Sequence, residues 1–157
     1  MSRVMSTSDS RDAISKLIIT YAERVDLGDF EGVGALFEHS TYRSVLGDDI
    51  VTYNGSGDVQ STMESMVMRY DDGTPRTKHV TTNLMIDVDE GAGSATAKSY
   101  FSVLQQVGDS PLQVIIAGRY HDRFERVAGE WRFADRLIYS DLIGDLSRHL
   151  TVDPYAT

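Results

Sequence analysis

The second half of the chain changes its hydrophobic period, and this change constrains the fold more than any other feature. Apolar and polar residues alternate over residues 78–88, 94–107, 112–127 and 130–141, which is the pattern of half-buried β-strands. The segments DEGAGS, GDSP and AGE separate these stretches, and such segments are typical of hairpin turns. We therefore expect four long antiparallel strands.

The first half carries helical patterns instead. A first helix can be capped by Ser8 or Ser10, and two shorter helical patterns, from about residue 29 and over 58–70, flank two short strands in TYRSVLGDDIVTYNG. Helices that precede an antiparallel sheet indicate an α+β domain. We expect a cone-shaped barrel, in which three N-terminal helices close a strongly curved, mostly antiparallel sheet around a pocket. The first helix is supported by apolar residues at helical spacing: Ile14, Leu17, Ile18, Tyr21 and Val25.

Length and composition limit the class of protein. The 157 residues fit one domain, which we place at 9–146, with a flexible N-terminus at 1–8 and a tail at 147–157. The net charge of −9 is spread along the chain, which argues against nucleic acid or an anionic membrane as a partner. Cysteine is absent, and we find neither an apolar leader nor a membrane-spanning run. We therefore expect a cytoplasmic protein.

The strand that begins at KHVTTN raises the first question about function. Its alternation puts Val80, Leu84 and the later apolar residues on one face, which we expect to face the core. His79 and Asn83 share the opposite face. That polar face is either exposed to solvent or lines a cavity, and the alternation of residues does not decide between the two.

Two charged residues lie in places where a solvated role is only one interpretation. Asp26 lies at the edge of the first helix's apolar stripe and near the helix C-terminus, where a carboxylate is unfavourable unless it has a partner. Arg136 lies in the last strand and is either a surface residue or an anion contact. The four histidines are scattered, so we expect no metal site, and we expect His149 to be exposed.

Three segments together resemble a known family. AISKLIITYAERVDLGDFEGVGALF, KHVTTNLMI and AGRYHDRFERVAGEWRFADRLI resemble the SnoaL-like branch of the nuclear-transport-factor-2-like superfamily, from about residue 10 to 145. The likeness is strongest to cofactor-free lyases of this superfamily, namely hexachlorocyclohexane dehydrochlorinase, bile-acid 7α-dehydratase and scytalone dehydratase. The resemblance implies the cone-shaped fold, and no cofactor.

The resemblance also implies roles for particular residues. In these lyases an aspartate near the end of the first helix pairs with a histidine that begins a later strand, and Asp26 and His79 match those positions. Tyr21 and Arg136 match a tyrosine and an arginine of the site. A second acidic or imidazole group found in the next strand of some relatives has no counterpart here, where Ser102 is the nearest polar residue.

Our first hypothesis is therefore a cofactor-independent lyase of the dehydratase or dehydrohalogenase type, acting on a small hydrophobic cyclic or polyketide-like substrate. His79 would take a proton, Asp26 would orient it, and Arg136 and Tyr21 would stabilise the departing group. The alternatives are an isomerase or polyketide cyclase, or a non-catalytic ligand-binding module like the β-subunits of ring-hydroxylating dioxygenases. The relatives imply a homo-oligomer, a trimer or a dimer. We expect the substrate to be bound by Ser102, Asn83, Met63, Val67 and Tyr139.

Overall fold

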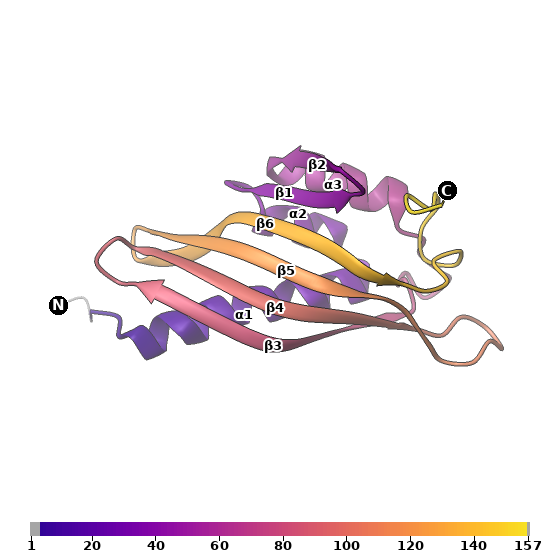
Figure 1. The fold of residues 1–157 in the computed structure, drawn as a ribbon, viewed down its shortest axis with the longest axis horizontal. Helices are drawn as coiled ribbons and strands as arrows, with labels where there is room; N and C mark the ends of the chain where they lie inside the picture. Colours follow the sequence, from indigo (N-terminus) through magenta and orange to yellow (C-terminus); the bar gives the residue numbers. More distant parts are fainter. Residues whose placement is uncertain (1–3, 157) are drawn as a thin grey trace.

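Three helices and six strands make up the protein in the computed structural model, which describes residues 4–156 (Figure 1). The helical patterns and the strand patterns of the sequence are confirmed in their order. The elements are α1 (Thr7–Leu27), α2 (Phe30–Leu36), β1 (Thr41–Leu46), β2 (Asp49–Asn54), α3 (Gly55–Met66), β3 (Thr77–Asp89), β4 (Ser94–Gln105), β5 (Gln113–Val127) and β6 (Glu130–Ile143).

The strands form one twisted sheet in the order β2-β1-β6-β5-β4-β3. All neighbouring strands are antiparallel except β1 and β6, which are parallel. The helices lie behind one face of this sheet, which we call the inner face, and α1 packs mainly against β3 and also contacts β6 (Figure 1). The expected α+β fold with a mostly antiparallel sheet and three N-terminal helices is therefore confirmed.

Helix α1 begins earlier than the sequence pattern predicted. Ser6 is its N-cap, and it forms a capping box with Asp9: the Asp9 backbone N–H donates to Ser6 Oγ at 3.2 Å, and the Ser6 N–H donates to the Asp9 carboxylate at 3.0 Å. The prediction of Ser8 or Ser10 as the cap is wrong, because Ser10 is buried inside the helix. Of the predicted flexible segment 1–8, residues 7 and 8 are helical and residues 1–3 lie outside the described residues.

The core lies between the helices and the inner face of the sheet. The apolar stripe of α1 meets aromatic side chains from α2, β5 and β6, and Phe133 stacks on Phe37 with ring centroids 4.9 Å apart. Burial of this apolar surface is what holds the short, glycine-containing α2 in place. The side chains that are almost completely buried include Ile14, Ile18, Phe30, Val33, Phe37, Ile115, Phe124 and Phe133.

A β-bulge in β3 reverses the side-chain alternation of that strand. The pairing with β4 shifts between Thr82 and Met85, and Asn83 has a positive φ of 53°. His79 therefore points inward before the bulge, whereas the apolar residues point inward only after it. The prediction that Val80 and Leu84 belong to the core is wrong, since their side chains are 41% and 37% exposed.

A second irregularity reverses the side-chain alternation of β6. The pairing of β5 with β6 shifts between Arg123 and Phe124, which leaves Ala134 without a direct partner. Phe133 therefore faces inward before the bulge, and Arg136 and Ile138 face inward after it. Inward and outward side chains do not alternate regularly along either strand. The two bulges decide which polar side chains face the interior.

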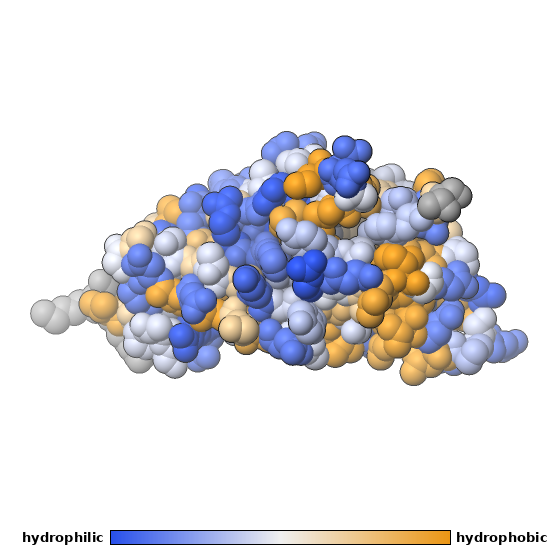
Figure 2. Space-filling view, in the orientation of Figure 1, coloured by the Kyte–Doolittle hydropathy of each residue, from blue (hydrophilic) through white to orange (hydrophobic). Residues whose placement is uncertain are grey.

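The outer face of the sheet carries apolar residues at the end where β3 and β5 begin (Figure 2). Val80, Val114 and Leu142 are 41%, 57% and 70% exposed there, and Val80 and Leu142 lie in one row across the sheet. The homo-oligomer implied by the resemblance stays a prediction. Within residues 4–156, no helix is long and apolar enough to span a membrane.

Candidate active site

The carboxylate of Asp26 and the imidazole of His79 are in direct contact. Asp26 lies one residue before the end of α1, and His79 is the third residue of β3. His79 Nδ1 lies 2.6 Å from Asp26 Oδ1, the His79 backbone N–H donates to Oδ2 at 2.8 Å, and the Thr77 hydroxyl donates to Oδ1 at 2.8 Å. These three contacts fix the orientation of the carboxylate.

This arrangement decides which nitrogen of His79 is free. A carboxylate only accepts hydrogen bonds, so Nδ1 carries the proton that faces Asp26, and the lone pair of a neutral imidazole is on Nε2. Burial by itself raises the pKa of Asp26, but the hydrogen bond and the charge of His79 outweigh burial and hold that pKa below its usual value. Asp26 is therefore an ionised partner that holds His79 in one tautomer.

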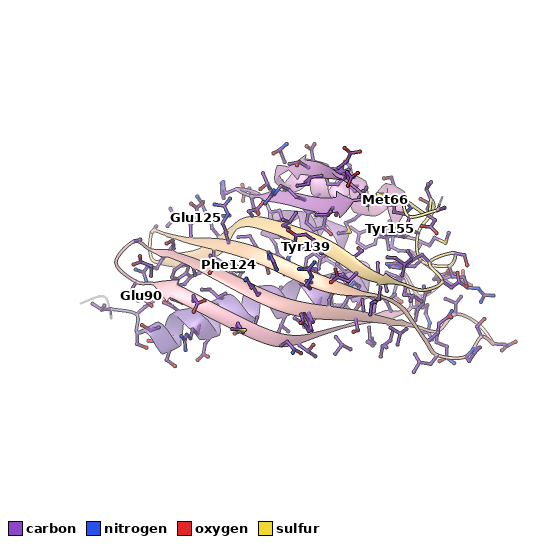
Figure 3. All side chains as sticks on the ribbon, viewed as in Figure 1. Met66, Glu90, Phe124, Glu125, Tyr139 and Tyr155 are labelled. Carbon is purple, nitrogen blue, oxygen red and sulfur yellow. The ribbon has the colours of Figure 1, made fainter. Side chains whose placement is uncertain are left out.

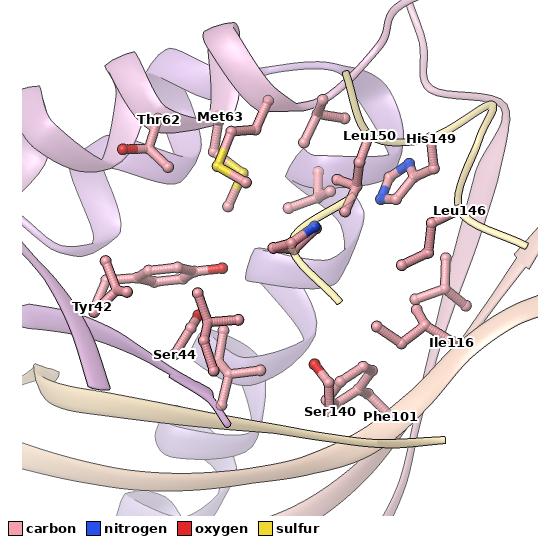
Figure 4. A pocket seen from close by; sticks show the side chains of 18 of the residues that line it. Tyr42, Ser44, Thr62, Met63, Phe101, Ile116, Ser140, Leu146, His149 and Leu150 are labelled. Carbon is pink, nitrogen blue, oxygen red and sulfur yellow. The ribbon is translucent and has the colours of Figure 1, made fainter. Parts of the chain in front are cut away.

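The pair lies at a cavity of about 160 Å³ between the sheet and the helices (Figure 4). Most of its lining is apolar, and the lining side chains come from the helices, the sheet and the segment after β6. Hydroxyl and imidazole groups are interspersed among the apolar side chains, as in many small-molecule sites. Besides His79, the lining residues are Tyr21, Val25, Tyr42, Ser44, Leu46, Val51, Tyr53, Thr62, Met63, Met66, Val67, Phe101, Val103, Ile116, Tyr120, Ile138, Ser140, Leu146, His149, Leu150, Pro154 and Tyr155.

Two tyrosine hydroxyls meet in the wall of the cavity. The hydroxyl oxygens of Tyr21 and Tyr42 are 2.8 Å apart and hydrogen-bonded, and both side chains are buried. Burial raises the pKa of Tyr21 and raises that of Tyr42 further, so both phenols are protonated near neutral pH. Tyr21 was expected in the site, whereas Tyr42 was missed because nothing in a short strand pattern distinguishes a cavity tyrosine from a core one.

Arg136 is not positioned as predicted. Its side chain is completely buried and does not line the cavity. Nε and Nη2 donate to the two oxygens of Asp122 at 2.8 and 2.9 Å, and the guanidinium carbon lies 4.3 Å from the ring centroid of Tyr21 and 3.8 Å from that of Tyr120. The prediction that Arg136 contacts a leaving group directly is wrong, because Nε and Nη2 face Asp122 and the rings of Tyr21 and Tyr120 lie between the guanidinium and the cavity.

The five predicted substrate-binding residues divide into two groups. Met63 and Val67 line the cavity, and their role in substrate binding stays a prediction. Ser102, Asn83 and Tyr139 do not line the cavity, and for these three the prediction is wrong. Ser102 is on the outer face of β4, and Asn83 is exposed at the bulge of β3.

Tyr139 lies on the outer face of β6 because of the bulge at Ala134 (Figure 3). There its ring lies 4.3 Å from the guanidinium carbon of Arg119 and 5.0 Å from the ring of His121. Regular alternation from Trp131 would have placed Tyr139 on the inner face. The residues of β6 that do reach the cavity are Ile138 and Ser140.

The segment after β6 is part of the cavity wall and not a separate tail. Leu146, His149, Leu150 and Tyr155 all line the cavity, and the Tyr155 hydroxyl donates to Ser140 Oγ at 2.7 Å (Figures 3 and 4). The prediction that His149 is exposed is wrong, since its side chain is buried. The spacing of Leu146 and Leu150, four residues apart beside His149, was the available signal of a buried helical turn.

The site offers a base and hydrogen-bond donors in an apolar enclosure. An imidazole oriented by a carboxylate can accept a proton from a bound molecule, and the phenols can stabilise negative charge. Within residues 4–156, no group of three histidine, aspartate or glutamate side chains is arranged to hold a metal ion.

Comparison with known proteins places the chain in a family. The model of the SnoaL-like domain matches residues 6–137. No curated protein sequence matches the chain significantly. Many solved structures share the fold, among them Rv3472 from Mycobacterium tuberculosis, a protein of unknown function (22% identity, TM-score 0.70, covering 90% of this chain and 79% of that one).

Two further solved structures also share the fold. One is provisionally assigned as a scytalone dehydratase from Novosphingobium aromaticivorans (21% identity, TM-score 0.65, covering 87% of each chain). The other is ActVI-ORFA from Streptomyces coelicolor (19% identity, TM-score 0.67, covering 84% of this chain and 97% of that one). At these identities the likeness shows a common fold. Since the family model spans most of the sequence, the chain belongs to the SnoaL-like domain family.

Proposed function

We propose that the protein is a cofactor-independent lyase of the dehydratase or dehydrohalogenase type, with a small hydrophobic cyclic or polyketide-like substrate. The observation that carries this proposal is the contact between Asp26 and His79, with His79 in the wall of a mostly apolar cavity. A carboxylate-oriented imidazole is a suitable base near neutral pH, and the apolar walls exclude water from the reacting carbon.

In the proposed reaction, the Nε2 lone pair of His79 takes a proton from the carbon next to the one that bears the leaving group. The electrons of the broken C–H bond form the new C=C bond. The leaving group departs as hydroxide or halide with the electrons of its own bond. A hydroxide leaving group takes up the proton from the His79 imidazolium to become water, which returns His79 to its neutral form. Asp26 stabilises the imidazolium that forms, because its pKa stays low beside His79.

The tyrosine pair supplies the hydrogen bonds for the developing negative charge. A protonated Tyr21 or Tyr42 can donate to the leaving oxygen or halide, or to an enolate oxygen of the substrate. Arg136 contributes from behind the ring of Tyr21, since its positive charge opposes the rise in the Tyr21 pKa that burial causes. Arg136 is thus a positioning and electrostatic residue in this proposal, one layer away from the substrate.

A panel of small cyclic β-hydroxy ketones and β-halo ketones tests the proposal, with products analysed by mass spectrometry. We expect loss of water or halide with the wild type, and a rate at least about 100-fold lower with His79→Gln or Asp26→Asn, the range typical of a lost general base. His39→Gln is the matched control, because the His39 side chain is 50% exposed.

Full activity of the His79→Gln and Asp26→Asn proteins, with circular dichroism showing that they are folded, would contradict the proposal. A product with the mass of the substrate would instead indicate isomerisation or cyclisation by the same dyad. That outcome keeps His79 as the base but removes the leaving group from the reaction.

A further inference from the structure

His149 brings a second imidazole to the cavity from a part of the chain that the dyad does not use. The segment after β6 folds back along α3, and its backbone is held there by hydrogen bonds. The Met68 N–H donates to the His149 carbonyl at 2.9 Å, the Thr151 N–H donates to the Met66 carbonyl at 2.9 Å, and the His149 N–H donates to the Leu146 carbonyl at 3.0 Å. The position of the His149 side chain is therefore set by ordered backbone.

The imidazole itself is buried and has no hydrogen-bond partner. Only 7% of His149 is exposed, and the ring lies in the cavity lining beside Leu146 and Leu150 (Figure 4). Nδ1 is fully buried and has no hydrogen-bond partner within residues 4–156. The ring lines the cavity and no described group bonds Nε2, so Nε2 is the nitrogen that a bound molecule can reach. Buried polar groups in proteins are nearly always paired, so an unpaired one at a cavity points to a missing partner.

The surroundings of His149 keep it uncharged. Burial first, and then repulsion from His79, lower the pKa of His149 to about 4, while the charge of Asp26 acts in the opposite direction. Near neutral pH the ring therefore offers one N–H donor and one lone-pair acceptor. Such a group fits a hydroxyl or a carbonyl, and it has no special attraction for a carboxylate or an ammonium group.

We propose that His149 is a substrate-binding residue that hydrogen-bonds an oxygen substituent of the substrate, so that the site takes an oxygenated ring compound in preference to a pure hydrocarbon or halocarbon. This inference deepens the proposed function, on which it rests for the use of the cavity. It limits the expected substrates to molecules that carry a hydroxyl or keto group. The roles differ: His79 moves a proton, and His149 holds the molecule that supplies it.

The size of the cavity limits the probe. A cavity of about 150 Å³ is known to hold benzene, and the volume here is about 160 Å³. Phenol and toluene are therefore suitable probes, because they have nearly the same shape and differ in one hydroxyl. Neither can undergo the proposed elimination, so their binding is measured independently of turnover.

Isothermal titration of wild type, His149→Phe and His39→Phe with both probes tests the proposal. We expect wild type to bind phenol more tightly than toluene. In His149→Phe the ratio of the two affinities should fall about 2- to 10-fold, because one hydrogen bond to phenol is lost. His39→Phe is the matched control, because it makes the same substitution at a half-exposed histidine outside the cavity lining, and its preference should equal that of wild type.

A second measurement needs no variant that alters the cavity. Ring-nitrogen NMR of the wild-type histidines should show the two His149 resonances moving when phenol is added and staying when toluene is added. Equal preference for phenol in wild type and His149→Phe, no preference for phenol in wild type, or unmoved His149 resonances would each overturn the inference. Loss of activity in the dyad variants bears on the lyase proposal alone, so the two proposals fail separately.

Discussion

Removing the carboxylate of Asp122 should destabilise the protein strongly, because it leaves the buried charge of Arg136 without a partner. Both side chains are completely buried, and the pair is bidentate at 2.8 and 2.9 Å. Asp122 and Arg136 are direct cross-strand neighbours on β5 and β6. The guanidinium has no route to water, since the rings of Tyr21 and Tyr120 cover it.

The magnitude follows from this burial. Breaking a buried ion pair by removing one partner costs about 3–5 kcal/mol, whereas replacing both partners by apolar residues of similar size is often neutral or stabilising. We expect Asp122→Val to lower the free energy of unfolding by about 3–5 kcal/mol. Arg136→Met should cost less than Asp122→Val, because burial already raises the pKa of Asp122 and a lone carboxyl group can take up a proton.

Urea unfolding followed by far-ultraviolet circular dichroism at pH 7 measures these differences, with the double variant Asp122→Val/Arg136→Met closing the cycle. The double variant should recover most of the loss. Asp141→Val is the matched control, because Asp141 makes a bidentate pair with Arg119 on the same two strands, at 2.8 and 3.0 Å, with both side chains more than a third exposed. It should cost less than about 1 kcal/mol.

Equal costs for Asp122→Val and Asp141→Val would refute this reasoning. It would mean that Arg136 reaches water or another anion when Asp122 is removed. The sequence-based interpretation of Arg136 as an anion contact would then regain support.

Three further predictions concern stability. Between pH 7 and pH 5, the free energy of unfolding of wild type should fall by about 2 kcal/mol more than that of His149→Phe. Folding lowers the His149 pKa from 6.5 to about 4, so the unfolded state binds an extra proton in this range, and wild-type stability falls as the pH drops from 6.5 toward 4. Asn83→Ala should destabilise by up to about 1 kcal/mol relative to Asn83→Gly, because φ is 53° at the β3 bulge. Gly118→Ala should cost about 1–3 kcal/mol, since a Cβ would lie 1.9 Å from the Tyr139 carbonyl oxygen.

Urea titrations check all three. Parallel pH curves for wild type and His149→Phe would contradict the first, and equal stability of the alanine and glycine variants at position 83 would contradict the second. A Gly118→Ala protein as stable as wild type would contradict the third, because it would show that β5 and β6 can move apart at Gly118 at no cost.

The order of elements could be predicted from the sequence because each element depends on nearby residues. The helical spacing of Ile14 and Ile18 and the turn segments between the long strands are local signals, and the structure follows them to within a few residues at most boundaries. The register of the strands is not local. One extra residue at Asn83 and another at Ala134 exchange the two faces of β3 and β6, and this is why Val80 and Tyr139 were assigned to the wrong side.

The candidate site, like the fold, could be predicted from the sequence only in part. Residue types and a family resemblance, and not spacing, paired Asp26 with His79, which lie 53 residues apart in the chain and 2.6 Å apart in space. The partner of Arg136 and the burial of His149 depend on strands and a terminal segment that meet only in the folded protein. The sequence alone determined which elements form, because short-range geometry and periodicity encode them. The tertiary structure decided which polar groups face the cavity, because a bulge or a returning segment changes a side chain's surroundings without changing its local pattern.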